Sequence, residues 1–443
     1  MSDHPSDYSK SEQRAWYFYD WANSAFATTV AALFLGPYLT VLAKNAADAG
    51  GFVYPLGIKV AAASLWPYVV SLSVLCQVFL LPVFGAVADY GRKKREMLGA
   101  VAFVGAAATI AMFSLEGKRY LLGCGLFLIA NSAFGAGNVI YNSFLPEIAP
   151  PGERDNISSR GWGLGYLGGG LLLLLNLILY SNAEKIGLAE STAVRISLAS
   201  AGVWWASFTL IPLSKLRNRG PQKAIPAGGN ALSAALRQLA GTVREVMRLP
   251  QTLRFLLAYL IYNDAIQTVL ALAAQFGQEE LKLPVASLTV AILIAQFVGV
   301  LGAMAFNWVA SRIGNKHTVM ITLATYCLVL VYAYGFVSTQ TEFYIMAGSI
   351  GAVMGGSQAL SRSIYSVMIP KGHEAEYYSI YEVSDKGTSW LGPLFFGLAL
   401  QFTGSYRISI LSLIVFFLAG LAILVFVDVN KAAGEARGMH SEN

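Results

Sequence analysis

Long intervals without charge constrain the fold of this 443-residue chain more than any other feature of its sequence. Each is long enough for the roughly 20 residues that a helix needs to cross a bilayer. Numbered here as spans one to twelve, they are Trp21–Ala43, Val60–Ala88, Met97–Leu115, Tyr120–Pro146, Gly161–Ala183, Ile196–Ser214, Phe255–Gln278 (interrupted by Asp264), Leu283–Ser311, His317–Thr341, Phe343–Pro370 (interrupted by Arg362), Gly387–Tyr406 and Ile408–Val427. We therefore predict an all-α polytopic membrane protein with twelve transmembrane helices.

The composition supports this class. Only 13% of the residues are charged, whereas soluble domains carry about 25%. The hydrophobic fraction is 56% and the mean hydropathy is +0.55, so the chain has more apolar surface than one aqueous core can hide. A transmembrane barrel is excluded because the apolar segments do not alternate as barrel strands of about ten residues would.

The placement of lysine and arginine predicts the orientation in the membrane. Most of the 31 Lys and Arg residues fall in the terminal segments and in connections on the same side as the N-terminus. The polar start of the chain lacks an apolar core with a cleavage site, so we expect no removable signal peptide. Both termini are expected in the cytoplasm, and the short loops suit a bacterial inner membrane. The net charge of +6 follows from this bias and requires no nucleic-acid partner.

The sequence contains no catalytic, metal-binding or nucleotide-binding motif. Its 4 histidines are scattered, and it has neither a His-Glu-x-x-His pattern nor a phosphate-binding Gly-Lys-Ser/Thr. Cys76, Cys124 and Cys327 lie inside predicted spans, where cysteine behaves as a small apolar residue. We therefore predict neither an enzyme nor a self-powered pump, and we expect no cofactor and no metal site.

A long polar connection divides the spans into two sets of six. We expect an N-terminal six-helix bundle over 1–214, a cytoplasmic linker over 215–250, a C-terminal six-helix bundle over 251–430 and a cytoplasmic tail over 431–443. Within the linker, Ala231–Met247 has apolar residues at helical spacing with interleaved arginines. It predicts an amphipathic helix, either on the inner leaflet or as an ordinary linker helix.

Three short strings recur in the same order in both halves. "YFYDWANSAF" in span one corresponds to "LIYNDAIQTV" in span seven, and "GLGYLGG" in span five to "GTSWLGP" in span eleven. Ala133–Pro150 aligns without gaps to Val353–Pro370. The matches indicate two pseudo-symmetric six-helix bundles made by duplication, an arrangement that places a substrate site between the halves near the midplane.

The aligned strings contain polar side chains inside the spans. In span one Asp20, Ser24 and Thr28 follow i, i+4, i+8 spacing, with Asn23 beside them. Such a stripe shares one helix face, and an Asp at a helix centre costs about 2.5–3.5 kcal/mol in a bilayer. We therefore expect it to face a central cavity. The cavity residues predicted in this way are Asn23, Ser24, Thr28, Asn138, Asn142, Asp264, Gln267, Gln358 and Arg362.

Depth separates the two intramembrane acids. Asp20 follows Arg14 by six residues, or about 9 Å along a helix, and Asp264 follows Arg254 by ten residues, or about 15 Å. Asp264 is therefore expected near mid-bilayer, either as a coupling or substrate-binding group or as a structural acid paired with arginine or amides. Asp20 is expected nearer the inner mouth, as a gate residue, a second candidate for proton coupling, or an interfacial capping acid.

The remaining charges near the spans suit pairing roles. Arg362 can bind a substrate carboxylate or neutralise an intramembrane acid. Glu382, Asp385 and Lys386 precede span eleven on the inner side. We interpret these three as an inner-gate ion network, with plain surface solvation as the alternative.

The segment "GAVADYGRKKR" (Gly85–Arg95) follows span two on the inner side. It resembles the loop signature of the major facilitator superfamily, although it is one residue short between Asp89 and Gly91. In that superfamily the motif bridges helices in the outward-open state, so the resemblance implies a gating role for Asp89 and Arg92. The alternative is simple anchoring of cations on the inner side.

Other strings point to one branch of that superfamily. "WYFYDWANSAFATTV", "YNDA", "GGSQALSRS" and "KGTSWLGP" resemble the vacuolar-effluxer-like family over nearly the whole chain. The resemblance implies export or uptake of small solutes by alternating access, with amino acids the best-known class. Separately, we take protons as a candidate coupling ion through Asp264 or Asp20, and we expect a secondary active transporter that is a monomer in the lipid bilayer. Export of amphiphiles, drugs or lipids, and a non-transporting receptor on the same fold, are the alternatives.

Overall fold

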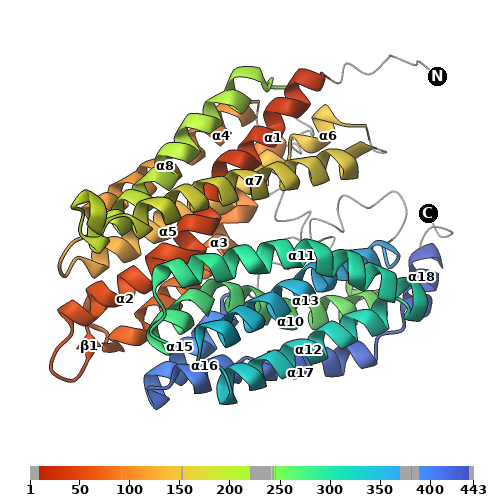
Figure 1. Cartoon of the computed structure of the whole chain (residues 1–443). Coiled ribbons are helices and arrows are strands. Elements are labelled where there is room, and N and C mark those ends of the chain that lie inside the picture. Colours follow the sequence, from red (N-terminus) through yellow and green to blue (C-terminus); the bar gives the residue numbers. More distant parts are fainter. Residues whose placement is uncertain are drawn as a thin grey trace. The chain divides into compact units, whose positions relative to one another are not determined.

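The computed structural model describes residues 9–90, 92–150, 153–219, 241, 244, 246–369, 381 and 389–438. The linker helix expected over Ala231–Met247 falls mostly outside these residues. Within them the structure is almost wholly helical (Figure 1). The helices are α1 (Lys10–Ala25), α2 (Leu35–Ala46), α3 (Leu65–Tyr90), α4 (Lys94–Ala111), α5 (Tyr120–Asn142), α6 (Leu145–Ile148), α7 (Arg154–Ser181), α8 (Glu190–Lys215), α10 (Pro250–Glu279), α11 (Val285–Ile313), α12 (Asn315–Gly335), α13 (Gln340–Ser366), α15 (Leu391–Thr403), α16 (Tyr406–Ser412), α17 (Ile414–Val425) and α18 (Val429–Gly438).

Each predicted span corresponds to helical structure. Among the described residues, 10 helical segments are long and apolar enough to cross a membrane. The other two spans are α13, which has 27 residues, and α15, a shorter apolar helix of 13 residues. The prediction of twelve helices is consistent with this count, because α1–α2 form span one and α16–α17 form span twelve.

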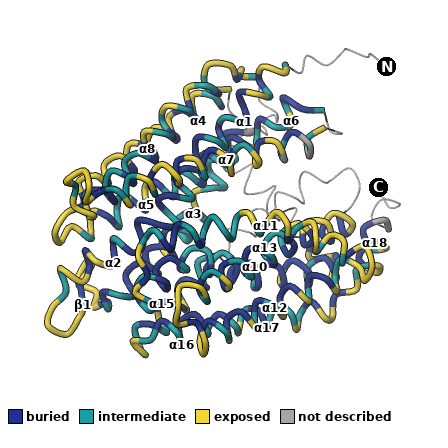
Figure 2. Tube along the Cα trace, in the orientation of Figure 1, coloured by how far each residue is buried: buried dark blue, intermediate teal, exposed yellow. Residues whose placement is uncertain are grey.

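The helices form two compact units. The first comprises Met1–Lys59 and Cys76–Leu236, and the second comprises Val60–Leu75 and Arg237–Asn443. Helix α3 is therefore divided between the units at Leu75. Spans one and seven, which open the two sequence halves, are the most buried spans (Figure 2). The first span of each half thus forms the centre of its unit.

In the first unit α1 packs against α7 and α8, and α4 packs against α5 and α8. Glycines on one face of α7 permit the contact with α1. A Cβ added to Gly168 would lie 2.6 Å from the carbonyl oxygen of Trp21, and one added to Gly165 would lie 2.7 Å from Ser24 Oγ. Small residues allow two helices to approach within backbone contact, so the glycine-rich sequence of span five sets the spacing of α1 and α7.

In the second unit α11 and α13 pack along their length in the same way. A Cβ on Gly302 would collide with the backbone of Ala352, and a Cβ on Gly351 with that of Ala295. Helix α10 packs against α17, which also contacts α12. Because these glycines have no side chain, the backbones of α11 and α13 can come close together, although α13 is among the less apolar spans.

Span one is helical throughout, but its middle is not an α-helix. Residues Phe26–Phe34 form a π-helix that joins α1 to α2. At its end the amide of Leu35 donates to the carbonyl of Val30, five residues earlier. The stretch begins within the polar stripe of span one, because Thr28 lies in it and Ser24 precedes it. Such π-turns often occur at functional positions in helices.

Candidate functional site

Two hydrogen-bonded pairs join α1 to α5 in the first unit. Tyr141 donates from its hydroxyl to Asp20 Oδ2 at 2.7 Å, and Asn23 Nδ2 donates to Asn138 Oδ1 at 2.6 Å. The pairs run in opposite order along the two helices, as antiparallel neighbours require. Asn23 is buried, whereas Asp20 and Asn138 are half-buried. Each pair therefore combines one buried side chain, Asn23 or Tyr141, with one half-buried partner.

Ser24 in α1 and Thr28 in the π-helix that follows lie on the side of span one that meets α7. Both are half-buried. The hydroxyl of Thr28 donates to the carbonyl of Ser24 at 2.9 Å and lies 3.4 Å from the carbonyl of Gly169. The stripe predicted in span one thus packs along the glycine face of α7, with part of its surface left accessible. Asn142, at the end of α5, is exposed.

Asp264 is the most buried of the predicted site residues, at 1% exposure. Its Oδ2 accepts a hydrogen bond from the backbone amide of Gly392 at 2.8 Å, and its backbone carbonyl accepts one from the Thr268 hydroxyl at 2.7 Å. Gly392 is in the first turn of α15, so the acid caps this helix and faces its positive end. The other carboxylate oxygen, Oδ1, has no hydrogen-bond partner among the described residues.

The other predicted residues of the second unit do not gather around Asp264. Gln267 and Gln358 are half-buried, and neither is hydrogen-bonded to Asp264 in the described part of the chain. Arg362 is exposed near the C-terminal end of α13. The structure therefore places one buried acid and three more accessible polar groups in this unit.

Aligned positions make corresponding contacts in the two units. Gly168 packs against Trp21 in the first unit, and Gly392 packs against Asp264 in the second. These are matching pairs in the sequence alignment of the halves. Gln13 at the start of span one donates to the carbonyl of Ile148, and Thr252 at the start of span seven donates to the carbonyl of Met368, the position aligned with Ile148. The shared contacts support the predicted pseudo-symmetry of the bundles.

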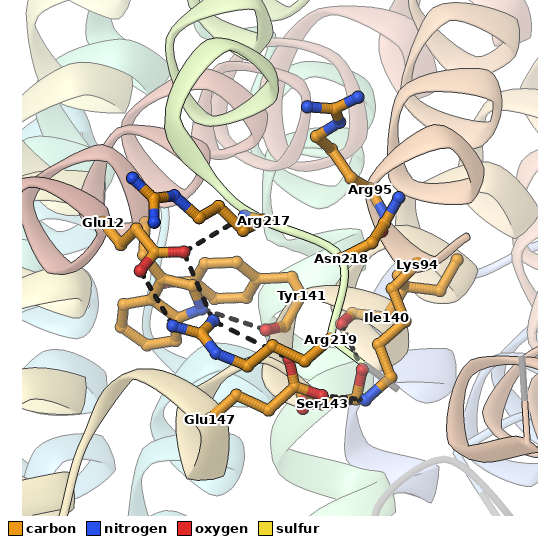
Figure 3. A network of polar contacts seen from close by, with 11 residues as sticks. Glu12, Lys94, Arg95, Ile140, Tyr141, Ser143, Glu147, Arg217, Asn218 and Arg219 are labelled. Carbon is orange, nitrogen blue, oxygen red and sulfur yellow. Dashed lines mark hydrogen bonds and ion pairs between the residues drawn. The ribbon is translucent and has the colours of Figure 1, made fainter. Parts of the chain in front are cut away.

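A charge network that sequence analysis missed lies in the first unit (Figure 3). Lys94 Nζ pairs with Glu147 Oε1 at 2.6 Å, and their side chains are 1% and 7% exposed. Arg219 pairs with Glu12 at 2.8 Å and lies 4.0 Å from Glu147. The network joins the starts of α1 and α4 to α6 and to the segment after α8. Glu12 also accepts a hydrogen bond from the amide of Arg217, which fixes the start of the linker.

The predicted gate residues are only partly described. Asp89 is in the last turn of α3, and its side chain lies outside the described residues. Arg92 is exposed and makes no ion pair with a described residue. Lys94, from the same basic motif, instead makes the buried ion pair. Glu382, Asp385 and Lys386 lie outside the described residues.

No metal centre is found in the part of the chain that the structure describes. It contains no group of three or more His, Cys, Asp or Glu side chains that could hold a metal ion. Cys76, Cys124 and Cys327 are free and half-buried.

The architecture is the major facilitator fold. The structure aligns with the nucleoside transporter NupG at a TM-score of 0.66, over 94% of this chain and 97% of that one. It aligns with a D-xylose-proton symporter at a TM-score of 0.67, over 96% and 99% of the two chains. Both are 14% identical to this chain, so they establish the fold alone.

Within this class, residues 8–437 match the family described as "Vacuole effluxer Atg22 like", and the chain belongs to that family. It is 29% identical to the uncharacterized MFS-type transporter YxiO of Bacillus subtilis, over 94% of each chain. It is 26% identical to autophagy-related protein 22-1 of Penicillium rubens, over 98% of this chain and 92% of that protein. The family resemblance inferred from the sequence is confirmed, and the chain is a transporter and not an enzyme.

Proposed function

We propose that this transporter moves a small polar organic solute, with amino acids the leading class, by alternating access of its two bundles. The main support is the pair of contacts Asp20–Tyr141 and Asn23–Asn138 between α1 and α5. A zwitterionic amino acid needs an anionic acceptor for its ammonium group and neutral or cationic donors for its carboxylate. The first unit offers the acceptor, the hydroxyl and the amides within two helical turns.

The accessibility of these groups favours a polar ligand. Asp20, Ser24, Thr28 and Asn138 are half-buried, so each keeps part of its surface for a solute. In the second unit Gln267, Gln358 and Arg362 also keep accessible surface. Ligand sites of this kind combine an apolar lining with a few placed polar groups that fix orientation.

Of the two candidate acids, we propose Asp264 and not Asp20 as the first choice for the group that couples proton movement to transport. Asp264 is nearly fully buried, one of its oxygens caps α15, and the other has no hydrogen-bond partner among the described residues. A charged carboxylate in this position is costly, and a proton on Oδ1 removes that cost without displacing Gly392. Gain and loss of this proton would change how strongly the acid holds the amino end of α15.

Gating is proposed at the inner ends of both units. Asp20, Asp89, Arg92, Glu382, Asp385 and Lys386 remain candidates, and the pair Lys94–Glu147 joins them through its position in the same basic motif. We further propose a bacterial inner-membrane location with both termini in the cytoplasm, supported by the distribution of lysine and arginine. The transporter is proposed to act as a monomer.

One observation favours amphiphile transport as a second candidate. A groove of about 460 Å³ lies between α7 and α8 in the first unit. Its apolar lining is Leu172, Leu175, Ile196, Val203, Trp204 and Phe208. An acyl chain or an aromatic drug would fit this surface, whereas a free amino acid would not.

Thermal unfolding of the purified protein with panels of amino acids, sugars and amphiphiles distinguishes these candidates. A ligand at 100 times its Kd stabilises the folded state by about 2.7 kcal/mol, which is readily seen as a rise in Tm. We expect particular amino acids to raise Tm. If only amphiphiles do so, amino-acid transport is the wrong proposal.

Variants then localise the effect. Asn138→Leu removes one partner of the buried amide pair and should abolish stabilisation and uptake of the amino acid in proteoliposomes. Asn182→Leu is the matched control, because Asn182 is half-buried directly after α7 and its side chain makes local hydrogen bonds, donating to Ile178 and accepting from Lys185. Equal loss in both variants would show that the amide change acts through general destabilisation.

A further inference from the structure

The connection between spans one and two carries an apolar tip. Leu56 is 96% exposed, and its neighbours Tyr54 and Ile58 are also exposed. The tip stands beyond the end of α2 at Ala46, so it is a loop and not part of a span. Exposed apolar residues are normal where helices meet lipid, but three of them at a loop tip lack that explanation.

The backbone at the tip makes the leucine more unusual. Leu56 has φ of +51°, in the left-handed region, within the short helical turn Pro55–Gly57. A residue with a Cβ is strained there, and glycine or asparagine would relieve the strain. Because the Leu56 side chain is almost fully exposed, packing within the described chain does not offset this cost.

The loop nevertheless has a fixed shape. Asp48 Oδ1 accepts hydrogen bonds from the amides of Gly50 and Phe52, each at 2.9 Å, and the Tyr54 hydroxyl donates to Asp48 Oδ2 at 2.7 Å. Lys59 Nζ lies 4.0 Å from the centre of the Phe52 ring. These contacts hold the loop in one conformation, and in that conformation the Leu56 side chain is exposed.

The residue types at the tip and its position between two spans indicate that the bilayer surface is its partner. The loop is flanked on both sides by membrane-spanning helices, which end at Ala46 and resume near Ala62, so the bilayer surface is the nearest large surface. Tyrosine, leucine and isoleucine beside a lysine are typical of segments that insert at the level of lipid headgroups. Asp48, the acid of the loop, has both oxygens occupied by internal hydrogen bonds.

We propose that Tyr54, Leu56 and Ile58 form an anchor that inserts into the bilayer surface next to spans one and two. Burial of these side chains in the lipid supplies the free energy that the left-handed conformation of Leu56 costs. The anchor would hold the outer end of span one against the membrane while the inner part of that span changes position during transport. The last step rests on the proposed alternating-access function, whereas the insertion itself does not.

The test places an environment-sensitive fluorophore at Leu56→Cys in a background with Cys76, Cys124 and Cys327 replaced by alanine, reconstituted in phosphatidylcholine nanodiscs. We expect blue-shifted emission and at least twofold quenching by lipids that carry a nitroxide near the headgroup. The control is Lys118→Cys, in the exposed polar loop between α4 and α5. It should be quenched by soluble iodide and little by the lipid nitroxide.

A second pair of measurements separates insertion from a structural role. Leu56→Gly relieves the strain and should raise Tm in detergent, yet it should lower lipid quenching of a fluorophore at Ile58→Cys. Quenching of the Leu56→Cys label by iodide and not by lipid would overturn the proposal. Protection from both quenchers would also overturn it, because a protein partner would then cover the tip. If the unmodified protein does not transport amino acids, the proposed function is refuted, but these quenching results still stand.

Discussion

The carboxylate of Asp264 in α10 caps the first turn of α15 through the amide of Gly392, at 2.8 Å. This contact ties span seven to span eleven inside the second unit. It also makes Asp264 a structural group as well as the proposed coupling group. Substitutions that separate charge from hydrogen bonding can therefore distinguish the two roles.

Asp264→Asn keeps an oxygen that can accept from Gly392 but removes the charge and the titratable proton. We expect gradient-driven uptake in vesicles to be lost while substrate exchange is retained. Asp264→Ala should in addition lower stability by about 1 kcal/mol, because the cap is lost. Thr268→Val is the control, because it removes a hydroxyl that donates to the backbone carbonyl of Asp264 and leaves the Asp264 carboxylate in place. A pH dependence of uptake that is unchanged in Asp264→Asn would remove Asp264 from the coupling mechanism.

The glycine face of α7 predicts a sharp positional contrast. Gly168→Ala introduces a methyl 2.6 Å from the carbonyl of Trp21, so it should separate α1 from α7 and cost about 1–3 kcal/mol. Gly163→Ala, on the same helix, meets nothing within 4 Å and should be tolerated. Folded yield and Tm in detergent measure both. Similar values for the two variants would show that the contact does not determine packing.

The ion pair Lys94–Glu147 should behave as a buried pair. Removing one partner leaves an uncompensated buried charge, so Lys94→Met or Glu147→Leu should each destabilise by about 3 kcal/mol. The double variant Lys94→Met/Glu147→Leu should recover much of that loss. Arg95→Gln is the control, because the Arg95–Glu96 pair is exposed and such pairs contribute little. Additive losses in the double variant would contradict the coupling of the two charges.

Acidification should loosen the loop that carries Leu56. The Tyr54 hydroxyl and the amides of Phe52 and Gly50 hold the pKa of Asp48 below its usual value, with the charge of Lys59 adding to the effect. A lowered pKa means that the contribution to loop order is full at neutral pH and is lost as the pH falls through the lowered value. Spin-label mobility at Leu56→Cys, followed from pH 7 downward, should rise only below the usual carboxyl range. Tyr54→Phe should move the rise to higher pH, and Asp48→Asn should abolish the dependence.

Much of the fold could be predicted because a bilayer restricts the choices. The charge-free intervals locate the spans without knowledge of any tertiary contact, and helical periodicity identifies the face that carries Asp20, Ser24 and Thr28. Periodicity does not say which neighbouring helix meets that face. The packing of this stripe against the glycines of α7 became known only from the structure.

The charge network could not be predicted for a related reason. Arg219 and Glu12 are 207 residues apart in the sequence, and each alone looks like a solvated charge near a span end. Tyr141, which donates to Asp20 from 121 residues away, looks like an ordinary apolar core residue. Pairings of this kind follow from tertiary packing and leave no local pattern in the chain.

The π-helix Phe26–Phe34 gives span one a built-in phase offset. In an α-helix each residue turns the chain by about 100°. The i→i+5 bonds of the π-helix need more residues per turn, so each residue there turns the chain by less. If the same residues formed ordinary α-helical hydrogen bonds, everything on one side of the stretch would rotate relative to the other. Asp20 and the residues around it would then point away from α5 and α7, although no contacting residue had been changed. The direction in which Asp20 and its neighbours face is thus set by the hydrogen-bond pattern of a mostly apolar segment.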